Sequence, residues 1–208
     1  MRFVALLAAS VFCGFGSGCG PTTEHVEVQE GSSPESNQVR SDPDKAGVAA
    51  LADPKGEVLV EASMELVESV PVETDLDQPG LRDTCEVWLE MVAAARETID
   101  LAHFYASNRE EGPLEPVIRA IEAAANRGVT VRFLAEKKFY ETYPDTLDRL
   151  SEHASIEVRH LDLSGITGGV LHAKYMLVDE GDVFVGSANF DWRSLKHIQE
   201  LGLRLRSS

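Results

Sequence analysis

The residues best suited to chemistry in this chain lie in one short stretch, from Leu171 to Trp192. Its pattern is H-x-K-x4-D-x6-G-S-x-N, and the residues that fill it are His172, Lys174, Asp179, Gly186, Ser187 and Asn189. A pattern with this many fixed positions should recur by chance in a chain of this length with a probability on the order of 10^-6 to 10^-5. The spacing therefore indicates a functional site.

These side chains suit phosphodiester chemistry. An imidazole can attack phosphorus, and an ammonium, a hydroxyl and a carboxamide can donate hydrogen bonds to anionic phosphoryl oxygens. We therefore interpret His172 as the catalytic nucleophile and Lys174, Ser187 and Asn189 as substrate-binding groups. Lys174 is also catalytic in this interpretation, because it stabilises the charge that develops on the phosphoryl oxygen. The chemistry requires no metal and no cofactor.

A β-hairpin is the element that would gather these residues. Residues 171–178 are rich in aliphatic and β-branched side chains, and in a strand residues two apart share a face, so His172 and Lys174 should project together. Residues 179–182 predict a polar, glycine-containing turn, and 183–186 a returning strand. The return would bring the serine and asparagine of the motif back to the histidine.

The stretch resembles the signature of the phospholipase D superfamily, usually called the HKD motif. Residues 64–70, 88–105 and 186–202 are also similar to the first half of one branch of that superfamily. This branch contains the mammalian lysosomal phospholipase-D-like exonucleases and the poxvirus envelope phospholipase. The resemblance covers about two thirds of the chain.

The resemblance implies a reaction in two steps through a covalent phosphohistidine. A second histidine, from a second copy of the motif, would protonate the leaving alcohol. A carboxylate would hold the other ring nitrogen of the nucleophile and fix its tautomer. Glu200 lies at the position that aligns with this carboxylate in the small single-motif nucleases, which makes it a third catalytic residue. Asp179 and Gly186 are interpreted as structural residues of the hairpin.

Only one copy of the motif is present, and one half-site cannot complete the reaction. The other histidines are not followed two residues later by lysine; they are His25, His103, His153, His160 and His197. Either a symmetric homodimer brings two copies of His172 together, or the sequence is the front half of a two-motif protein. We favour the second, because the similarity is to a first half and no covering helix follows the strand predicted over residues 201–206.

The N-terminal region predicts export and a lipid anchor. Residues 1–19 have the layout of a signal peptide, with an apolar run at 3–15 and small residues before Cys19, the lipidation site of a bacterial lipobox. Acyl chains on Cys19 would hold the protein to a membrane of the bacterial cell envelope, at the outer membrane or in the periplasm. Ordinary cleavage and secretion is the alternative. Residues 20–60 predict an acidic, flexible tether, and 61–208 the catalytic half-domain.

The charge of the chain bears on its substrate. The net charge is -16: residues 20–80 carry -11, residues 81–208 carry -6, and Arg2 adds +1. Strong binding to duplex nucleic acid needs many basic contacts, so the acidity argues against a protein that binds duplex nucleic acid. A phospholipid or the end of a nucleic-acid strand remains as the substrate.

Helices and strands alternate along the half-domain. Asp83 or Thr84 can cap the first helix, and Pro113 and Gly128 bracket the second. The remaining signals predict strands at 98–105, 129–135, 155–160 and 201–206, helices at 114–126 and 145–153, and a loop at 161–169 that borders the site. This order predicts an α/β, phospholipase-D-like fold: a mixed β-sheet with helices on both faces.

Three functions are compatible with these residues. The first is a phosphodiesterase that hydrolyses phospholipid or nucleic-acid-end phosphodiesters. The second is a phosphatidyltransferase, in which an alcohol rather than water captures the phosphohistidine. The third is a non-catalytic envelope protein that uses the fold for binding.

Overall fold

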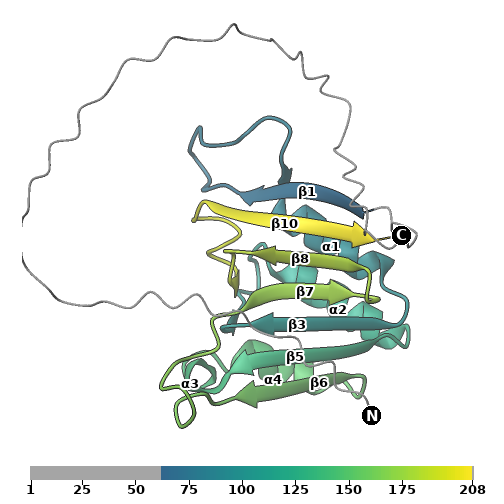
Figure 1. Ribbon diagram of the computed structural model, residues 1–208, viewed down its shortest axis with the longest axis vertical. Coiled ribbons are helices and arrows are strands. Elements are labelled where there is room, and N and C mark those ends of the chain that lie inside the picture. Colours follow the sequence, from purple (N-terminus) through teal and green to yellow (C-terminus); the bar gives the residue numbers. More distant parts are fainter. Residues whose placement is uncertain (1–61, 208) are drawn as a thin grey trace, which may run out of the picture. The chain divides into compact units, whose positions relative to one another are not determined.

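One mixed β-sheet forms the centre of the fold. The structure is a computed structural model and describes residues 62–207. Its strands are β1 Ala62–Ser69, β2 Arg82–Asp83, β3 Thr98–His103, β4 Ala106–Ser107, β5 Thr130–Glu136, β6 Ile156–Leu161, β7 Lys174–Val178, β8 Asp182–Gly186, β9 Phe190–Asp191 and β10 Glu200–Ser207. The main sheet has the order β2-β1-β10-β8-β7-β3-β5-β6, and β4 pairs with β9 (Figure 1). The predicted α/β class with a mixed sheet is confirmed.

The helices of the described part are α1 Thr84–Ala94, α2 Glu115–Asn126, α3 Lys137–Tyr140 and α4 Asp145–Ser151. Helices α1, α2 and α4 all lie behind the sheet in Figure 1. Strands β3, β5 and β6 are parallel and follow one another in a single direction across the sheet, so right-handed crossovers place both connecting helices on the same side. The expected helices on both faces are therefore found on one face only within residues 62–207.

The helices begin and end where the sequence indicates. The carboxylate of Asp83 caps α1 by accepting hydrogen bonds from the backbone N–H of Cys85 at 2.8 Å and of Glu86 at 3.3 Å. Helix α2 follows Pro113, and Gly128 lies beyond its end with a φ of 97°, a left-handed conformation that favours glycine. These predicted helices are confirmed, with small shifts at their ends.

The hydrophobic core lies between the sheet and the helices. Trp88 of α1 packs edge-on against Phe184 of β8, with ring centroids 5.5 Å apart, and stacks on Phe190 at the same distance. All three rings are buried. Burying a side chain of this size contributes about 1.5–3 kcal/mol. This core fixes α1 against the strands that carry the motif.

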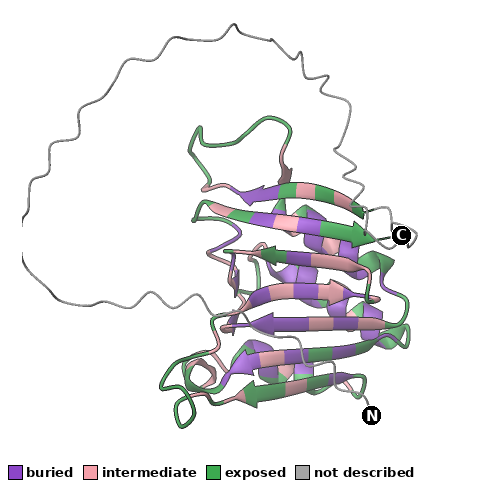
Figure 2. Cartoon of the chain, viewed as in Figure 1, coloured by how far each residue is buried: buried purple, intermediate pink, exposed green. Residues whose placement is uncertain are grey.

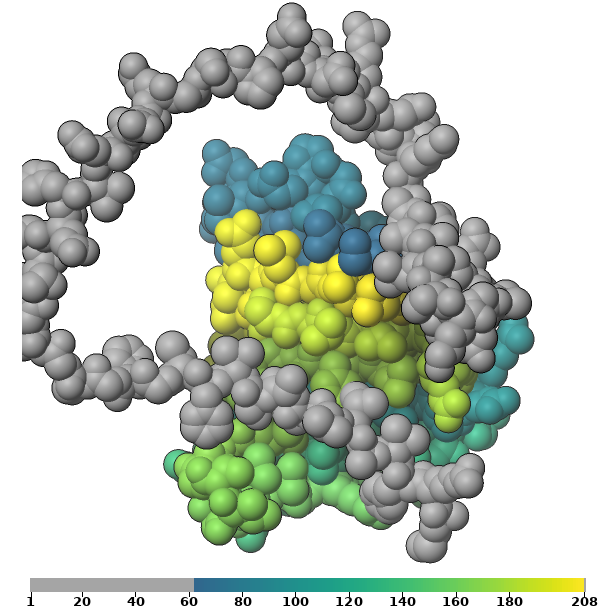
Figure 3. Space-filling view, in the orientation of Figure 1, coloured from purple at the N-terminus to yellow at the C-terminus, as the bar shows by residue number. Residues whose placement is uncertain are grey.

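The opposite side of the sheet, here called the open face, carries aliphatic side chains that no described helix covers. Successive residues of a strand alternate between faces. The register therefore aligns a row across β1, β10, β8 and β7, consisting of Leu66, Leu203, Val185 and Tyr175, and a second row consisting of Met64, Leu205, Val183 and Leu177. Met64 and Leu66 are 59% and 56% exposed. Figure 2 shows exposed segments of β1 and β10 in green, and Figure 3 shows the molecule from the same side with its atoms filled in.

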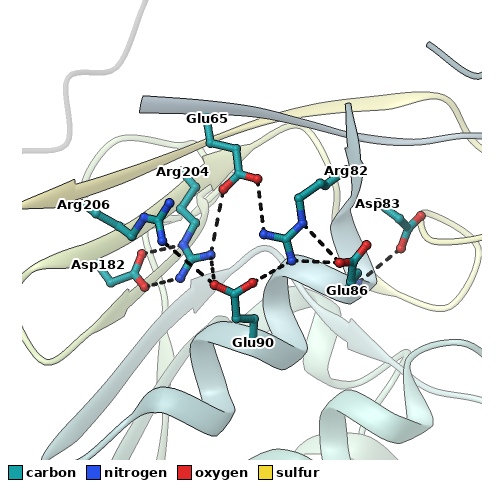
Figure 4. Close-up of polar contacts among 8 residues, drawn as sticks. All are labelled: Glu65, Arg82, Asp83, Glu86, Glu90, Asp182, Arg204 and Arg206. Atoms are coloured by element: carbon teal, nitrogen blue, oxygen red, sulfur yellow. Dashed lines mark hydrogen bonds and ion pairs between the residues drawn. The ribbon is translucent and has the colours of Figure 1, made fainter. Parts of the chain in front are cut away.

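Charged side chains between α1 and the sheet form a second feature, here called the charged cluster (Figure 4). Arg204 is buried and pairs with Asp182 at 2.6 Å and with Glu90 at 2.7 Å. Glu65 lies within 3.3 Å of Arg82 and 3.9 Å of Arg204. The cluster consists of Glu65, Arg82, Glu86, Glu90, Asp182 and Arg204. It ties α1 to β1, β8 and β10 through pairs of opposite charge.

The predicted signal peptide with Cys19 and the predicted tether at 20–60 lie outside the described residues. From residue 62 to residue 207, no helix has the length and apolar character that crossing a bilayer needs.

Candidate active site

The hairpin brings the motif to one edge of the sheet. In Figure 1, β7 and β10 begin at the edge where β3 and β8 end. Strands β7 and β8 pair antiparallel, with Tyr175 opposite Val185, so the chain returns to the start of β7 as predicted. Residues before β7, after β8 and at the start of β10 therefore share this edge. They include His172, Ser187 and Glu200.

His172 and Lys174 form the centre of the site. The ammonium Nζ of Lys174 lies 3.2 Å from both Nδ1 and Nε2 of the imidazole, and 3.4 Å from the carbonyl oxygen of His172. His172 precedes β7, whereas we predicted a strand that begins at Leu171. Its ring is exposed and meets the ring of Phe104 edge-on at a centroid distance of 4.7 Å. The predicted proximity of the two side chains is confirmed.

The local environment favours the neutral form of His172. Partial burial lowers the pKa of His172, and the nearby positive charge of Lys174 lowers it further. An unprotonated imidazole is the form that can act as a nucleophile. Lys174 is only 8% exposed, and this burial lowers its pKa, while the negative charge of Glu200 acts in the opposite direction. The site thus combines an imidazole that favours its neutral form with a poorly hydrated cation.

Ser187 and Glu200 are joined across the end of β8 and the start of β10. The hydroxyl of Ser187 donates a hydrogen bond to Oε2 of Glu200 at 2.5 Å and accepts one from the backbone N–H of Leu201 at 3.1 Å. Glu200 therefore contacts Ser187 and acts electrostatically on Lys174. Its role as the carboxylate that holds the second ring nitrogen of His172 stays a prediction.

Asn189 has an unused hydrogen-bonding atom. Its amide oxygen is buried and has no hydrogen-bond partner among residues 62–207. Buried polar atoms are almost always paired in folded proteins, so an unpaired one at a predicted site is a candidate ligand contact. The roles of Asn189 and Ser187 in substrate binding stay predictions.

Asp179 and Gly186 make structural contacts at the two ends of the hairpin. The carboxylate of Asp179 accepts three backbone N–H hydrogen bonds, from Arg96 and Glu97 at 2.8 Å and from Thr98 at 2.9 Å. Burial raises the pKa of Asp179, but the three donors outweigh it and leave the pKa lowered. A Cβ at Gly186 would come within 2.9 Å of the carbonyl oxygen of Leu201, so this position of β8 needs glycine.

His103 is a buried neighbour of the site that the sequence did not single out. It pairs in register with Lys174 across β3 and β7 and is 1% exposed. Both ring nitrogens lack a hydrogen-bond partner in the described part of the chain. Burial, followed by the charge of Lys174, lowers the pKa of His103 to about 3. The predicted strand at 98–105 contained His103, but only the pairing of β3 with β7 places it beside the lysine.

No group of three or more His, Cys, Asp or Glu side chains gathers to hold a metal ion within the described residues. The groups that could bind a ligand at this edge are instead cationic and hydrogen-bonding side chains. Lys174 can attract an anionic oxygen, and His172 lies next to the point where that oxygen would be held. The arrangement suits nucleophilic attack on a phosphorus centre.

Comparison with protein families gives a match over residues 88–208 to the family model described as "Cardiolipin synthase, PLD-like domain". This match includes the second part of α1, all elements from β3 to β10 and the complete motif. It covers more than half of the chain.

Three curated proteins are similar in sequence. "Phospholipase D Y" of Dictyostelium discoideum is 34% identical over 70% of this chain and 35% of its own length. "5'-3' exonuclease PLD3" of Homo sapiens is 35% identical over 66% of this chain and 30% of its own length. The "Virion nicking-joining enzyme" of Vaccinia virus (strain Western Reserve) is 34% identical over 67% of this chain and 33% of its own length. The chain thus spans about a third of the length of these relatives.

Among solved structures, NucT from Helicobacter pylori shares the fold with a TM-score of 0.57 and 22% sequence identity. The similarity covers 70% of this chain and 86% of the NucT chain. The fold, the family model and the HKD motif at the sheet edge agree: this chain belongs to the phospholipase-D-like family.

Proposed function

We propose that this chain supplies one catalytic half of a phosphodiesterase that works through a phosphohistidine. A ring nitrogen of His172 attacks phosphorus, the N–P bond forms and the P–O bond to the leaving alcohol breaks. A second histidine, from another copy of the motif, gives its proton to the leaving oxygen. Water then attacks the phosphohistidine, this second histidine takes the proton, and His172 is released.

One contact supports this proposal above all. The exposed imidazole of His172 lies 3.2 Å from the ammonium of Lys174, and its pKa is lowered by partial burial and by that cation. In the neutral imidazole, a ring nitrogen keeps the lone pair that attacks phosphorus. Removing one group that stabilises the developing charge in comparable sites costs about 10²–10³ in rate, so Lys174 has a substantial effect to contribute.

The substrate class follows from the charge of the domain. Residues 81–208 carry a net charge of -6, which offers little attraction for a long polyanion. We propose a substrate with one accessible phosphodiester, either a phospholipid headgroup or the end of a nucleic-acid strand. In a phosphatidyltransferase the same phosphohistidine would pass to an alcohol, and product analysis with added alcohol would detect that transfer.

Hydrolysis of bis(p-nitrophenyl) phosphate in EDTA tests the proposal. The purified chain is compared with His172→Ala and with a control, His153→Ala, which changes a histidine that follows α4 and lies 3.6 Å from Glu122 of α2. Light scattering gives the mass of the active species. Turnover that only His172→Ala abolishes, from a dimer, would support a site completed by two copies of the chain.

Inactivity of a folded monomer would call for the same assay on a protein that carries two motifs. If that longer protein also released no p-nitrophenol, the proposal would be wrong. Binding within the cell envelope without catalysis would then be the better account of the fold.

We also propose that Cys19 is acylated and holds the protein to the bacterial cell envelope, at the outer membrane or facing the periplasm. The support is the order of charged, apolar and small residues before Cys19. Mass spectrometry of the membrane fraction should find a diacylglyceryl group on Cys19, and Cys19→Ser should release the protein. A soluble, unmodified mature chain would point to secretion instead.

A further inference from the structure

Glu136 is a buried carboxylate that holds the chain just before His172. It ends β5 and is 2% exposed. Its side chain accepts the backbone N–H of Leu171 at 2.5 Å and that of Lys138 at 3.4 Å. Glutamate is seldom fully buried, because the ionised carboxylate loses its hydration. A buried glutamate whose short hydrogen bond goes to the amide before a nucleophile therefore has a candidate role in placing it.

A second hydrogen bond holds the other side of His172. The carbonyl oxygen of Ala173 accepts the backbone N–H of Phe104 at 3.0 Å. The residues before and after His172 are thus fixed to two different parts of the sheet, the end of β5 and the segment that follows β3. The imidazole itself packs against the ring of Phe104. Together these contacts set the position of the backbone from which the imidazole projects.

The loop that leads into Leu171 provides little support of its own. Leu163, Ile166, Thr167 and Gly169 form hydrogen bonds with one another inside the loop. Asp162, at its start, pairs with Lys137 at 3.4 Å, and both side chains are exposed, so solvent screens the pair and it contributes little. An open pocket of about 300 Å³ separates the loop from α3. The hydrogen bond from Leu171 to Glu136 therefore ties the end of this loop to a buried residue of β5.

We propose that Glu136 is the positioning residue for His172. This inference rests on the proposed function, because it assigns Glu136 to the placement of that nucleophile. Glu136 does not touch the substrate; it acts through the Leu171 amide and keeps the imidazole in line with the phosphorus. A displacement of about 1 Å can cost about 10²-fold in rate, so loss of the carboxylate should lower kcat.

Steady-state kinetics of the full chain on bis(p-nitrophenyl) phosphate test the role in catalysis. We expect Glu136→Ala to lower kcat by about 10- to 100-fold with little change in KM. Glu136→Gln keeps an oxygen that can accept the Leu171 N–H and should recover most of the rate. The matched control is Glu141→Ala, because Glu141 is an exposed glutamate that lines the same pocket. A purely structural role would change the folded fraction without this order among the variants.

NMR-detected amide exchange tests the positioning independently of turnover. The Leu171 amide should exchange at least about tenfold faster in Glu136→Ala than in the parent chain, while the Glu141→Ala control keeps its protection. If the parent chain and a two-motif protein that contains it are both inactive, the proposed function fails, and the exchange data alone decide whether Glu136 holds this segment. Unchanged protection of Leu171, or a Glu136→Ala variant with the parental kcat, would overturn the inference.

Discussion

The charged cluster and the active-site edge use buried charge in opposite ways. In the charged cluster, the guanidinium of Arg204 meets Asp182 and Glu90 at 2.6 and 2.7 Å. At the active-site edge, the buried ammonium of Lys174 makes its hydrogen-bonding contacts with His172, which bears no negative charge. The neighbouring His103 also has ring nitrogens without partners in the described residues.

The difference indicates what each region is built for. Buried polar groups that support a fold are normally satisfied within the protein. Buried polar groups that lack a hydrogen-bond partner near a cation reduce the stability of the fold. Such groups concentrate at sites that bind ligands or perform chemistry. Mutations in the charged cluster should therefore reduce stability, while mutations at the active-site edge should reduce activity.

Arg204→Met should have the largest effect on folding. It leaves the carboxylates of Asp182, Glu90 and Glu65 without their buried cation, which costs about 3–5 kcal/mol of unfolding free energy when one partner of such a pair is removed. Turnover per folded molecule should not change. Urea denaturation measures the free energy of unfolding, and kinetics normalised to the folded fraction measure the turnover. A variant with parental stability would show that the cluster is too well hydrated to support α1.

Lys174→Met should show the reverse behaviour. Turnover of bis(p-nitrophenyl) phosphate should fall by about 10²–10³, the range seen when a group that stabilises developing charge is removed. The free energy of unfolding should stay the same or rise, because the substitution removes a buried cation that has no carboxylate hydrogen-bond partner here. Measurement by the same two methods gives a direct comparison with Arg204→Met. Loss of stability equal to that of Arg204→Met would remove the distinction between the regions.

His103→Phe should flatten the dependence of stability on pH. Because the pKa of His103 is lowered to about 3 in the folded state, the unfolded chain binds a proton first as the pH falls below about 6.5. The contribution of neutral His103 to the free energy of unfolding is complete above that pH and is lost as the pH falls toward 3. At pH 5 the loss relative to pH 7 is about 2 kcal/mol. Phenylalanine fits among the rings of Trp88, Phe133 and Phe190. Chemical denaturation at pH 7 and pH 5 measures the change.

The control for this pH effect is His153→Ala, which alters a partly exposed histidine that follows α4. For this variant, the change in the free energy of unfolding between pH 7 and pH 5 should equal that of the parent chain. An unchanged slope in His103→Phe would mean that His103 is hydrated or paired in solution.

Asp179→Ala should have an effect on stability in the same range as that of His103. It removes the acceptor for the backbone N–H groups of Arg96, Glu97 and Thr98, and we expect a loss of about 1–3 kcal/mol, because solvent can replace part of the bonding. The folded pKa of Asp179 is lowered, so its contribution is present above the unfolded pKa and disappears as the pH falls through the folded pKa. Thermal melts at pH 7 and pH 3 should therefore differ less for Asp179→Ala than for the parent chain. If the melting temperature changed equally between pH 7 and pH 3 in both proteins, water would be satisfying the three backbone N–H groups.

The sequence was sufficient for local elements and for the motif, but not for contacts that depend on the order of strands. The hairpin could be predicted because the distance along the chain from His172 to Ser187 is short and its turn residues are distinctive. His103 and Glu136 could not be found in this way, since their roles arise only when β3 is placed between β5 and β7. The helices were expected on both faces because alternation of helix and strand does not reveal in which direction successive strands are added.

The open face has a practical consequence for any work with this domain in solution. Two rows of aliphatic side chains extend over four neighbouring strands of the described part, with Met64 and Leu66 more than half exposed. Apolar patches of this kind promote self-association and precipitation. Residues 62–207 alone should bind a hydrophobic fluorescent dye while folded and should stay monodisperse only in dilute solution or mild detergent. Solubility screens are therefore best designed around this surface rather than around the active-site edge.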